Sequence, residues 1–235
     1  ITFVDSDDYL DENFVARLYG ICVKEHVEIA ICRYMRTARD FARGEQNSTV
    51  ETFTNIEALE QMLYQKKYNM SACAKLYKRE LFEGISFPKG ELYEDVNTTY
   101  KVIERAGRVG YCRDQLYFYY VNPNSITCNA FHEGKLAYVT HMEEVLSFID
   151  REYPALRRAA EFRYIWANIH VWVHMPAGNM YKAQEKKIRS NIKAYRWNVI
   201  WDRNIGIKDR MIVLMSYGGH RFMRLVFQLQ ARAKG

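Results

Sequence analysis

The chain has 235 residues, of which 49% are hydrophobic and 26% charged, with a formal net charge of +6. This balance is typical of a globular protein with one large domain or two small ones. No stretch of 18 or more apolar residues occurs, so the sequence predicts no membrane-spanning helix, and no signal peptide is recognisable.

The first element is an apolar strand, Ile1–Val4, that runs directly into Asp5-Ser6-Asp7-Asp8. Ligands of open α/β sheets bind outside the carboxyl ends of the strands. A buried parallel strand also needs neighbours on both sides. We therefore expect about 80 to 100 residues of βα units upstream, which would hold a base-binding pocket.

Alternating helix and strand patterns follow up to about residue 128. Apolar spacing predicts helices over 10–24 and 55–66, the second with Asn55 as its N-cap. Strands are expected over 27–32, 109–112 and 115–121, and a turn at Asn122–Ser125. A polar loop is expected over 35–52, and a segment over 69–81 is expected to start extended and then turn helical. A further helix is expected from Glu94 to about Ala106, with Gly107 ending it.

The remainder, residues 129–235, is predicted to be a helical, basic extension. Helices are expected over 135–152, 155–174, 183–196 and 208–234. Residues 182–235 hold thirteen Lys and Arg against three Asp and Glu, a net of +10, which leaves −4 of the total +6 to residues 1–181. The sequence thus predicts an acidic α/β part with a basic helical part behind it.

The acid cluster Asp5-Ser6-Asp7-Asp8 has two interpretations. Asp and Ser favour turns and helix N-caps, so Asp7 or Asp8 would simply cap the next helix. Alternatively, adjacent carboxylates repel one another unless a cation compensates them, and Mg²⁺ and Mn²⁺ prefer oxygen ligands. The apolar strand before the cluster favours the metal site.

The pair Glu94-Asp95 also has two interpretations. Acids in a first helical turn complement the helix dipole. A carboxylate at a helix start beside a cleft is also suited to act as a general base. A metal and diphosphate site together with a base is the minimum apparatus for group transfer from a nucleotide-diphosphate donor.

Four stretches in order resemble the family 2 glycosyltransferases of the GT-A fold. Phe3 to Leu10 resembles the family's Asp-x-Asp strand end, and Tyr93-Glu94-Asp95 its Glu-Asp base motif. Ala74 to Leu81 with Phe87-Pro88 is similar to the segment before the acceptor site, and Leu116 to Tyr120 with Asn124 to Thr127 to the strand and turn that close the catalytic domain. The resemblance covers residues 1 to about 128.

The resemblance implies a Rossmann-like mixed sheet and an inverting, single-displacement transfer of a sugar. Asp7 would be the principal ligand of Mn²⁺ or Mg²⁺, Asp5 would contact the metal or the donor ribose, and Asp95 would be the catalytic base. Glu94 would shape the acceptor pocket, and Lys75 would approach the diphosphate or the acceptor. The donor would be a nucleotide-diphosphate-sugar and the acceptor a glycan or lipid-linked glycan. Without the upstream strands, the activity of this chain alone is left open.

The basic extension and the cysteines bear on location. Charge runs are usually solvated faces, and no nucleic-acid motif accompanies this one, so no nucleic-acid partner is expected. Basic residues interleaved with Met, Phe and Leu suit a helix on an anionic membrane surface. The five cysteines, Cys22, Cys32, Cys73, Cys112 and Cys128, form no CxxC pair and are odd in number, which predicts reduced thiols in a cytoplasmic protein. With the basic helices, the expected location is peripheral, at the inner face of the cell membrane. A zinc site at His170 and His174 would need further ligands.

Two other functions remain open on the sequence. One is a metal-dependent nucleotidyl- or phosphotransferase that uses the same acids. The other is a non-catalytic, membrane-associated assembly subunit.

Overall fold

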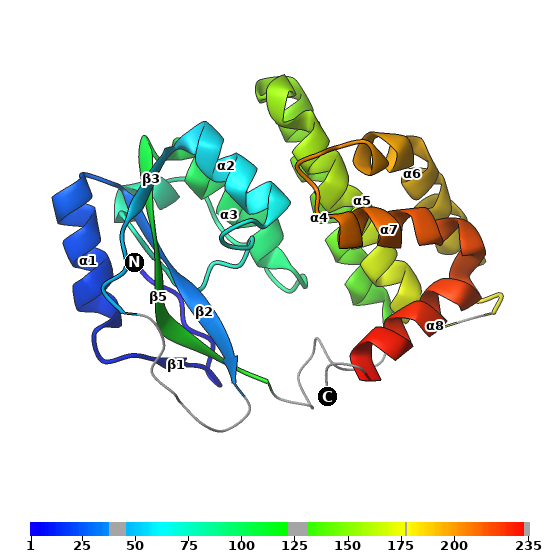
Figure 1. Ribbon diagram of the computed structural model, residues 1–235, viewed down its shortest axis with the longest axis horizontal. Helices are drawn as coiled ribbons and strands as arrows, with labels where there is room; N and C mark the ends of the chain where they lie inside the picture. Colours follow the sequence, from blue (N-terminus) through cyan, green and yellow to red (C-terminus); the bar gives the residue numbers. More distant parts are fainter. Residues whose placement is uncertain (38–45, 122–130, 177, 233–235) are drawn as a thin grey trace. The chain divides into compact units, whose positions relative to one another are not determined.

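The computed structural model describes residues 1–37, 46–121, 131–176 and 178–232 (Figure 1). These divide into two compact units. The first holds the described residues up to 89 and from 94 to 121. The second holds the described residues from 131 onward, together with the short segment Gly90–Tyr93. The sequence did not predict that Gly90–Tyr93 would belong to the helical unit.

The first unit is built on a five-stranded mixed sheet. Its strands are β1 (Tyr9–Leu10), β2 (Ile29–Thr37), β3 (Glu51–Thr54), β4 (Lys75–Tyr77) and β5 (Arg108–Tyr120). The order is β1-β5-β2-β4, and β3 also pairs with β5. β2 and β5 run parallel, whereas the other pairs are antiparallel. The mixed α/β architecture is confirmed.

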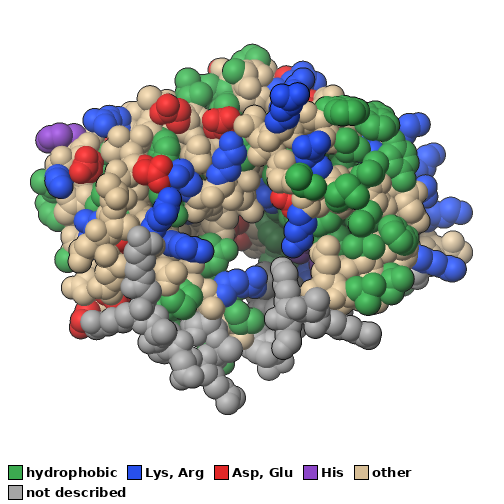
Figure 2. All heavy atoms as spheres, in the orientation of Figure 1, with side chains coloured by type: hydrophobic (Ala, Val, Ile, Leu, Met, Phe, Trp, Pro, Cys, Tyr) green, Lys and Arg blue, Asp and Glu red, His purple; other side chains and the backbone are tan. Residues whose placement is uncertain are grey.

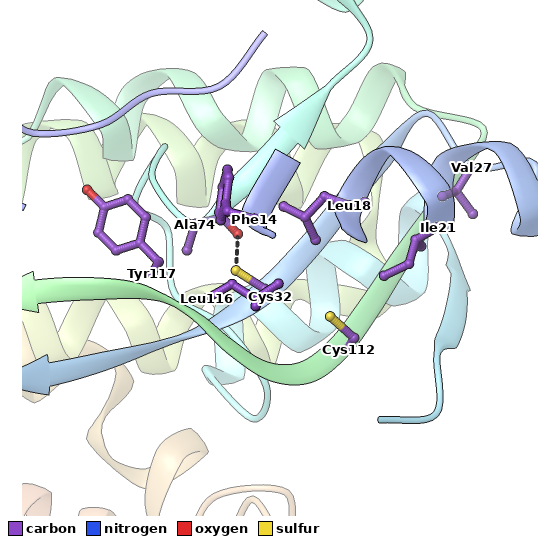
Figure 3. Close-up of a cluster of buried hydrophobic side chains, with 10 residues drawn as sticks. Phe14, Leu18, Ile21, Val27, Cys32, Ala74, Cys112, Leu116 and Tyr117 are labelled. Carbon is purple, nitrogen blue, oxygen red and sulfur yellow. Dashed lines mark hydrogen bonds between the residues drawn. The ribbon is translucent and has the colours of Figure 1, made fainter. Parts of the chain in front are cut away.

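Helices cover both faces of this sheet. α1 (Phe14–Glu25) lies on one face, and α2 (Asn55–Tyr64) and α3 (Glu94–Arg105) lie on the other, with a short 3₁₀ helix, η1 (Arg79–Phe82), after β4 (Figure 1). α1 buries a stripe at helical spacing, Phe14, Leu18 and Ile21, against Ala30 and Cys32 of β2 (Figure 3). The Cys32 thiol donates a hydrogen bond to the carbonyl oxygen of Ala74 at 3.5 Å, which ties β2 to the residue before β4.

The expectation of a buried strand over Ile1–Val4 is wrong in this structure. Ile1 exchanges two backbone hydrogen bonds with Tyr77 of β4, at 2.7 and 2.8 Å, which is the pattern of an antiparallel pair. However, Ile1 and Val4 are each 44% exposed. Only Phe3 is packed among rings, those of Tyr77, Phe82 and Phe87. The segment therefore lies at the β4 edge of the sheet.

The two strands expected over 109–112 and 115–121 form a single strand, β5. Its register against β2 shifts between Ile31 and Arg33, so β5 carries extra residues there, as a β-bulge does. Asp114 in the bulge accepts hydrogen bonds from Arg17 Nε and from the Ser48 N–H, both at 2.6 Å. These bonds satisfy the Asp114 carboxylate, so β5 continues through the polar residues between 112 and 115, where the sequence pattern suggested a break between two strands.

Three other local expectations change. The N-cap of α2 is Thr54, which forms a capping box with Glu57, rather than Asn55. The predicted loop over 35–52 is shorter, because β2 runs on to Thr37 and β3 starts at Glu51. Gly107 does not have the left-handed conformation of a helix-ending glycine; its N–H instead donates to Glu28 Oε2 at 2.5 Å. The turn at Asn122–Ser125, the Asn124–Thr127 stretch and Cys128 lie outside the described residues.

The second unit is helical, as expected. Its helices are η2 (Glu133–Leu136), α4 (Ala137–Glu152), η3 (Pro154–Leu156), α5 (Arg157–His174), α6 (Lys182–Ile200), α7 (Ile207–Met215), η4 (Ser216–Gly218) and α8 (Gly219–Arg232). α5 is the central helix and packs against α4, α6, α7 and α8. The helix expected over 208–234 is interrupted at η4, and its two parts bury Ile212, Val213 and Met223. The basic extension is therefore part of a packed core and not a detachable tail.

Candidate active site

The acid cluster forms a tight turn that is anchored to β5. The Asp8 N–H donates to the Asp5 carbonyl at 3.0 Å, which closes a four-residue turn. Asp8 Oδ2 accepts from the Tyr117 hydroxyl at 2.6 Å, and Asp8 Oδ1 accepts from the Tyr120 N–H at 2.9 Å. The Asp5 N–H in turn donates to the Tyr117 hydroxyl at 3.2 Å. Asp8 is thus a structural acid.

Neither Asp7 nor Asp8 caps the following helix. α1 begins at Phe14, and its N-cap residue Asn13 makes no side-chain capping bond. Asp11, which the sequence analysis did not single out, accepts from the Asn13 N–H at 2.9 Å. With Asp8 anchored to β5, the turn leaves Asp5 and Asp7 exposed.

Asp5 lies in a field of negative charge. Its pKa is raised above the ordinary value, first by partial burial and then by the carboxylates of Asp8, Asp7 and Glu94. A divalent cation at this position would relieve that repulsion. Exposed carboxylate oxygens are also the donors that Mg²⁺ and Mn²⁺ prefer. The charge and the ligand type at Asp5 and Asp7 therefore fit a hard cation.

A complete protein cage for a metal is not formed by this turn. Within the part of the chain that the structure describes, no group of three or more His, Cys, Asp and Glu side chains is arranged to hold a metal ion. Mg²⁺ commonly binds one or two carboxylates together with substrate phosphates and water. The two exposed acids match that second kind of site.

Glu94 and Asp95 are the first two residues of α3, as the sequence predicted. Asp95 accepts a hydrogen bond from the Val96 N–H at 2.8 Å. Its pKa is raised from 3.8 to about 6, first by burial and then by the Glu94 carboxylate; Asp5 adds to the shift, whereas the Val96 N–H and the Lys75 ammonium oppose it. The fold thus brings Asp5 and Asp95, ninety positions apart in the sequence, within electrostatic range of each other.

Lys75 lies under this site and is enclosed by protein. Its side chain is 1% exposed, and its ammonium donates to the carbonyl oxygens of Ser71 at 2.5 Å and Cys73 at 3.2 Å. Burial lowers its pKa to about 8, while Cys73, Cys32 and Asp95 oppose that shift. This geometry favours an electrostatic role beside Asp95, and support of the 71–74 loop, over direct contact with a ligand.

Two side chains of the site were missed by sequence reasoning. Tyr117 joins Asp5 and Asp8 through its hydroxyl, and the Cys73 thiol lies beside both Asp5 and Tyr117. Tyr117 belongs to a run of aromatic residues that looked like ordinary strand core. Only the parallel pairing that extends β5 beside β2, with β1 on its other side, makes the hydroxyl an anchor for the turn.

The histidine pair, His170 and His174, belongs to the helical unit. The rings of His170 and His174 are 4.7 Å apart, and burial, followed by His174, lowers the pKa of His170 to about 4. Among the residues that the structure describes, no third His, Cys, Asp or Glu side chain joins the pair to complete a metal site. Nothing in the geometry favours zinc there.

The chain is similar in sequence to two bacterial glycosyltransferases. Glycosyltransferase GlyA of Streptococcus pneumoniae is 28% identical over 176 residues, which cover 69% of this chain and 25% of GlyA. Glycosyltransferase GlyG of the same organism is 28% identical over 156 residues, covering 63% of this chain and 51% of GlyG. The chain thus spans about a quarter and about half of the lengths of these relatives. No family model matches the sequence.

The fold is similar to that of a solved structure of S. aureus TarS. Residues 1–349 of S. aureus TarS, in complex with UDP-GlcNAc, superpose with a TM-score of 0.56 at 16% identity, over 92% of this chain and 67% of that one. An identity this low supports the fold alone. In sequence the chain is therefore similar to two bacterial glycosyltransferases over about two thirds of its length, and the likeness to TarS is one of fold.

Proposed function

We propose that the protein transfers a sugar from a nucleotide-diphosphate-sugar to a glycan or lipid-linked glycan, by an inverting, single displacement of the GT-A, family 2 type. The observation that carries this proposal is the convergence of Asp5 and Asp7 with Asp95. Two kinds of carboxylate are needed, one for the donor diphosphate and one for the acceptor hydroxyl. The two glycosyltransferase relatives and the UDP-GlcNAc complex of TarS support a nucleotide-sugar donor.

Asp95 acts as the general base. Its pKa is raised to about 6, which makes it a stronger base than an ordinary aspartate, and because this value is still below neutrality the carboxylate form predominates at neutral pH. It removes the proton from the acceptor hydroxyl as the oxygen attacks the anomeric carbon, and the bond to the donor diphosphate breaks on the opposite side. Glu94, at the same helix start, borders the acceptor and helps to raise the pKa of Asp95.

Asp7 and Asp5 would hold Mn²⁺ or Mg²⁺ with the donor diphosphate. The metal, when bound, neutralises the negative charge that develops on the leaving diphosphate. Asp8 and Tyr117 keep the turn in place on β5. Lys75 stabilises the ionised form of Asp95 through its buried positive charge.

A test of the proposal compares Asp95→Asn and Asp7→Asn with wild type in the full-length protein. Asp95→Asn is expected to lower kcat by at least about a hundredfold, because general-base catalysis contributes on that order, with little change in donor affinity. Asp7→Asn is expected to weaken Mn²⁺-dependent nucleotide binding in calorimetry. Asp11→Asn, which changes an acid outside the site, is the charge-matched control.

Product analysis separates this proposal from its alternatives. A nucleotidyl- or phosphotransferase would release nucleotide products without moving sugar to any acceptor. A non-catalytic assembly subunit would show full activity of its complex after both substitutions. Either result would contradict the proposal.

We also propose that the helical unit associates with an anionic membrane surface. α7 and α8 each expose an apolar stripe at helical spacing, and two exposed tryptophans lie at the end of α6 and directly after it: Ile207, Met211 and Leu214; Phe222, Leu225 and Leu229; Trp197 and Trp201. Hydrophobic side chains gather over this unit in Figure 2. Arginines and lysines lie among these stripes in the sequence, which is the composition of interfacial helices. None of the described helices is both long and apolar enough to cross a bilayer, so the contact would be at the surface.

A further inference from the structure

Gly90–Tyr93 is a four-residue segment that belongs to the helical unit, although the chain on either side of it belongs to the α/β unit. It directly precedes Glu94 and Asp95. The segment therefore joins the packing of the helical unit to the start of α3 by a single peptide bond.

Its contacts are specific ones with the first helix of the helical unit. Glu91 Oε2 lies 3.3 Å from Nε2 of His141 in α4, whose side chain is 2% exposed. The ring of Tyr93 stacks on that of Tyr138, also in α4, with centroids 4.6 Å apart and planes at 18°. The Tyr138 hydroxyl accepts a hydrogen bond from Arg163 in α5 at 3.2 Å, which fixes this ring in turn.

The backbone of Tyr93 has an unusual conformation. Its φ of 60° lies in the left-handed region, which is unfavourable for a residue with a large side chain. Such a conformation persists only where the surroundings enforce it, and it is concentrated at functional sites. The stack on Tyr138 is one contact of this ring, and the left-handed residue comes directly before the first residue of α3.

We propose that Tyr138 and Tyr93 are positioning residues for the acid pair: their stack holds the left-handed turn that places Glu94 and Asp95 at the start of α3. This inference rests on the proposed role of Asp95 as the base. It gives the helical unit a part in catalysis that is separate from membrane association. Neither tyrosine needs to touch a substrate.

The test is a set of variants in the full-length protein. Tyr138→Ala removes the stack, whereas Tyr138→Phe keeps the stack and loses only the hydroxyl. We expect Tyr138→Ala to lower kcat by about tenfold or more, since small misplacements of a catalytic group are costly, with the KM for the donor unchanged. Tyr138→Phe is expected to retain the kcat of wild type. Phe148→Ala is the matched control, because it removes a different aromatic contact of α4, that with Tyr153.

A double-mutant cycle guards against a purely structural effect. Tyr93→Asn removes the stack from its other side, and because Asn tolerates the left-handed conformation, the substitution adds no backbone strain of its own. Tyr93→Asn with Tyr138→Ala is expected to cost no more in kcat than either change alone. Hydrogen exchange over residues 93–100 should rise in both single variants and stay at the wild-type rate in Phe148→Ala.

Three results would overturn the inference: an unchanged kcat in Tyr138→Ala, an equal loss in Phe148→Ala, or additive losses in the cycle. Asp95→Asn, assayed in parallel, keeps the two proposals separate. If Asp95→Asn retains full activity, the role of the base is wrong. If Asp95→Asn is inactive and Tyr138→Ala behaves as wild type, only the positioning role is wrong.

Discussion

Asp95 shows how one residue acquires a chemical role from its surroundings. Its carboxyl is partly buried beside Glu94, which disfavours the ionised form, while Lys75 beneath it favours that form. The outcome is a pKa of about 6, above the ordinary aspartate value but below neutrality. A general base is most effective when its pKa lies near the pH at which the enzyme works, because it is then both ionised and basic.

The pH dependence of activity follows from this value. Because only the ionised carboxylate accepts a proton, kcat/KM is expected to fall as the pH drops through about 6, well above the limb of an unperturbed aspartate. Glu94→Gln removes a charge that raises this pKa, so its acidic limb should move to lower pH. Steady-state rates measured between mildly acidic and neutral pH test this, and a limb that Glu94→Gln does not move would contradict it.

The same pKa predicts an opposite effect on stability. Between the unfolded value of 3.8 and the folded value of about 6, the native state holds a proton that the unfolded state has lost, so the native state is destabilised as the pH rises. Above pH 6 the full penalty applies. Asp95→Asn should therefore raise the free energy of unfolding at neutral pH while it abolishes activity. Urea unfolding with a midpoint below that of wild type would be the contrary result.

Tyr117 provides a third prediction at this scale. Tyr117→Phe leaves Asp8 and the Asp5 N–H without their shared partner, and an unsatisfied, partly buried polar group costs about 1–3 kcal/mol. Chemical denaturation should show that loss. Tyr119→Phe, on the same strand and only half-buried, is the control and should change the free energy of unfolding little.

At the scale of elements, the interface between α1 and the sheet positions the acid turn. α1 follows that turn, and its buried stripe packs on β2 and β5. Gly110 of β5 permits this close approach, because a Cβ at that position would lie 3.0 Å from Ile21 Cγ2 and 3.2 Å from Val27 Cγ2. The sequence pattern marks β5 as a strand but does not reveal which of its residues must be small.

Two glycine substitutions test this interface. Gly110→Ala should destabilise the protein by about 1–3 kcal/mol through overpacking. Gly20→Ala, in α1, meets nothing within 4 Å and should stabilise it by about 0.5–1 kcal/mol through helix propensity. Thermal or urea unfolding of both variants measures the contrast; equal effects would mean that the α1 interface is looser than described.

At the scale of the whole molecule, the two parts of the chain differ in net charge. The carboxylates of the candidate site lie in the α/β unit, whereas residues 182–235, which include α6, α7 and α8, hold a net charge of +10. Exposed apolar residues at helical spacing occur in α7 and α8, and also in α1, at Val15, Tyr19 and Val23. Deleting the chain from Lys208 onward would remove buried Ile212, Val213 and Met223 and uncover the side chains that pack against them, so membrane association is better tested by substituting surface residues.

Trp201, 69% exposed, and Leu225, 52% exposed, are suited to that test. Trp201→Ser with Leu225→Ser should reduce sedimentation with vesicles that contain anionic lipid, since each removes apolar area from the interface. The circular dichroism spectrum should remain that of wild type. Substituting Val15→Ser, an exposed apolar residue of α1, serves as the control. Equal vesicle binding by all three proteins would reject the membrane surface.

The sequence by itself determined the type and order of most elements, because apolar periodicity reports local geometry. It predicted α1, α3 and the helical unit, and it identified the carboxylates at Asp5, Asp7, Glu94 and Asp95, since residue type is visible without a fold. Tertiary structure decided everything that depends on distant partners. In the folded protein, Ile1–Val4 lies at the edge of the sheet, and the two expected strands form the single strand β5. Lys75 is buried, and Asp8 accepts hydrogen bonds from Tyr117 and Tyr120. The tertiary structure also assigned Gly90–Tyr93 to the helical unit. Such contacts join residues far apart in the chain, and no local pattern encodes them.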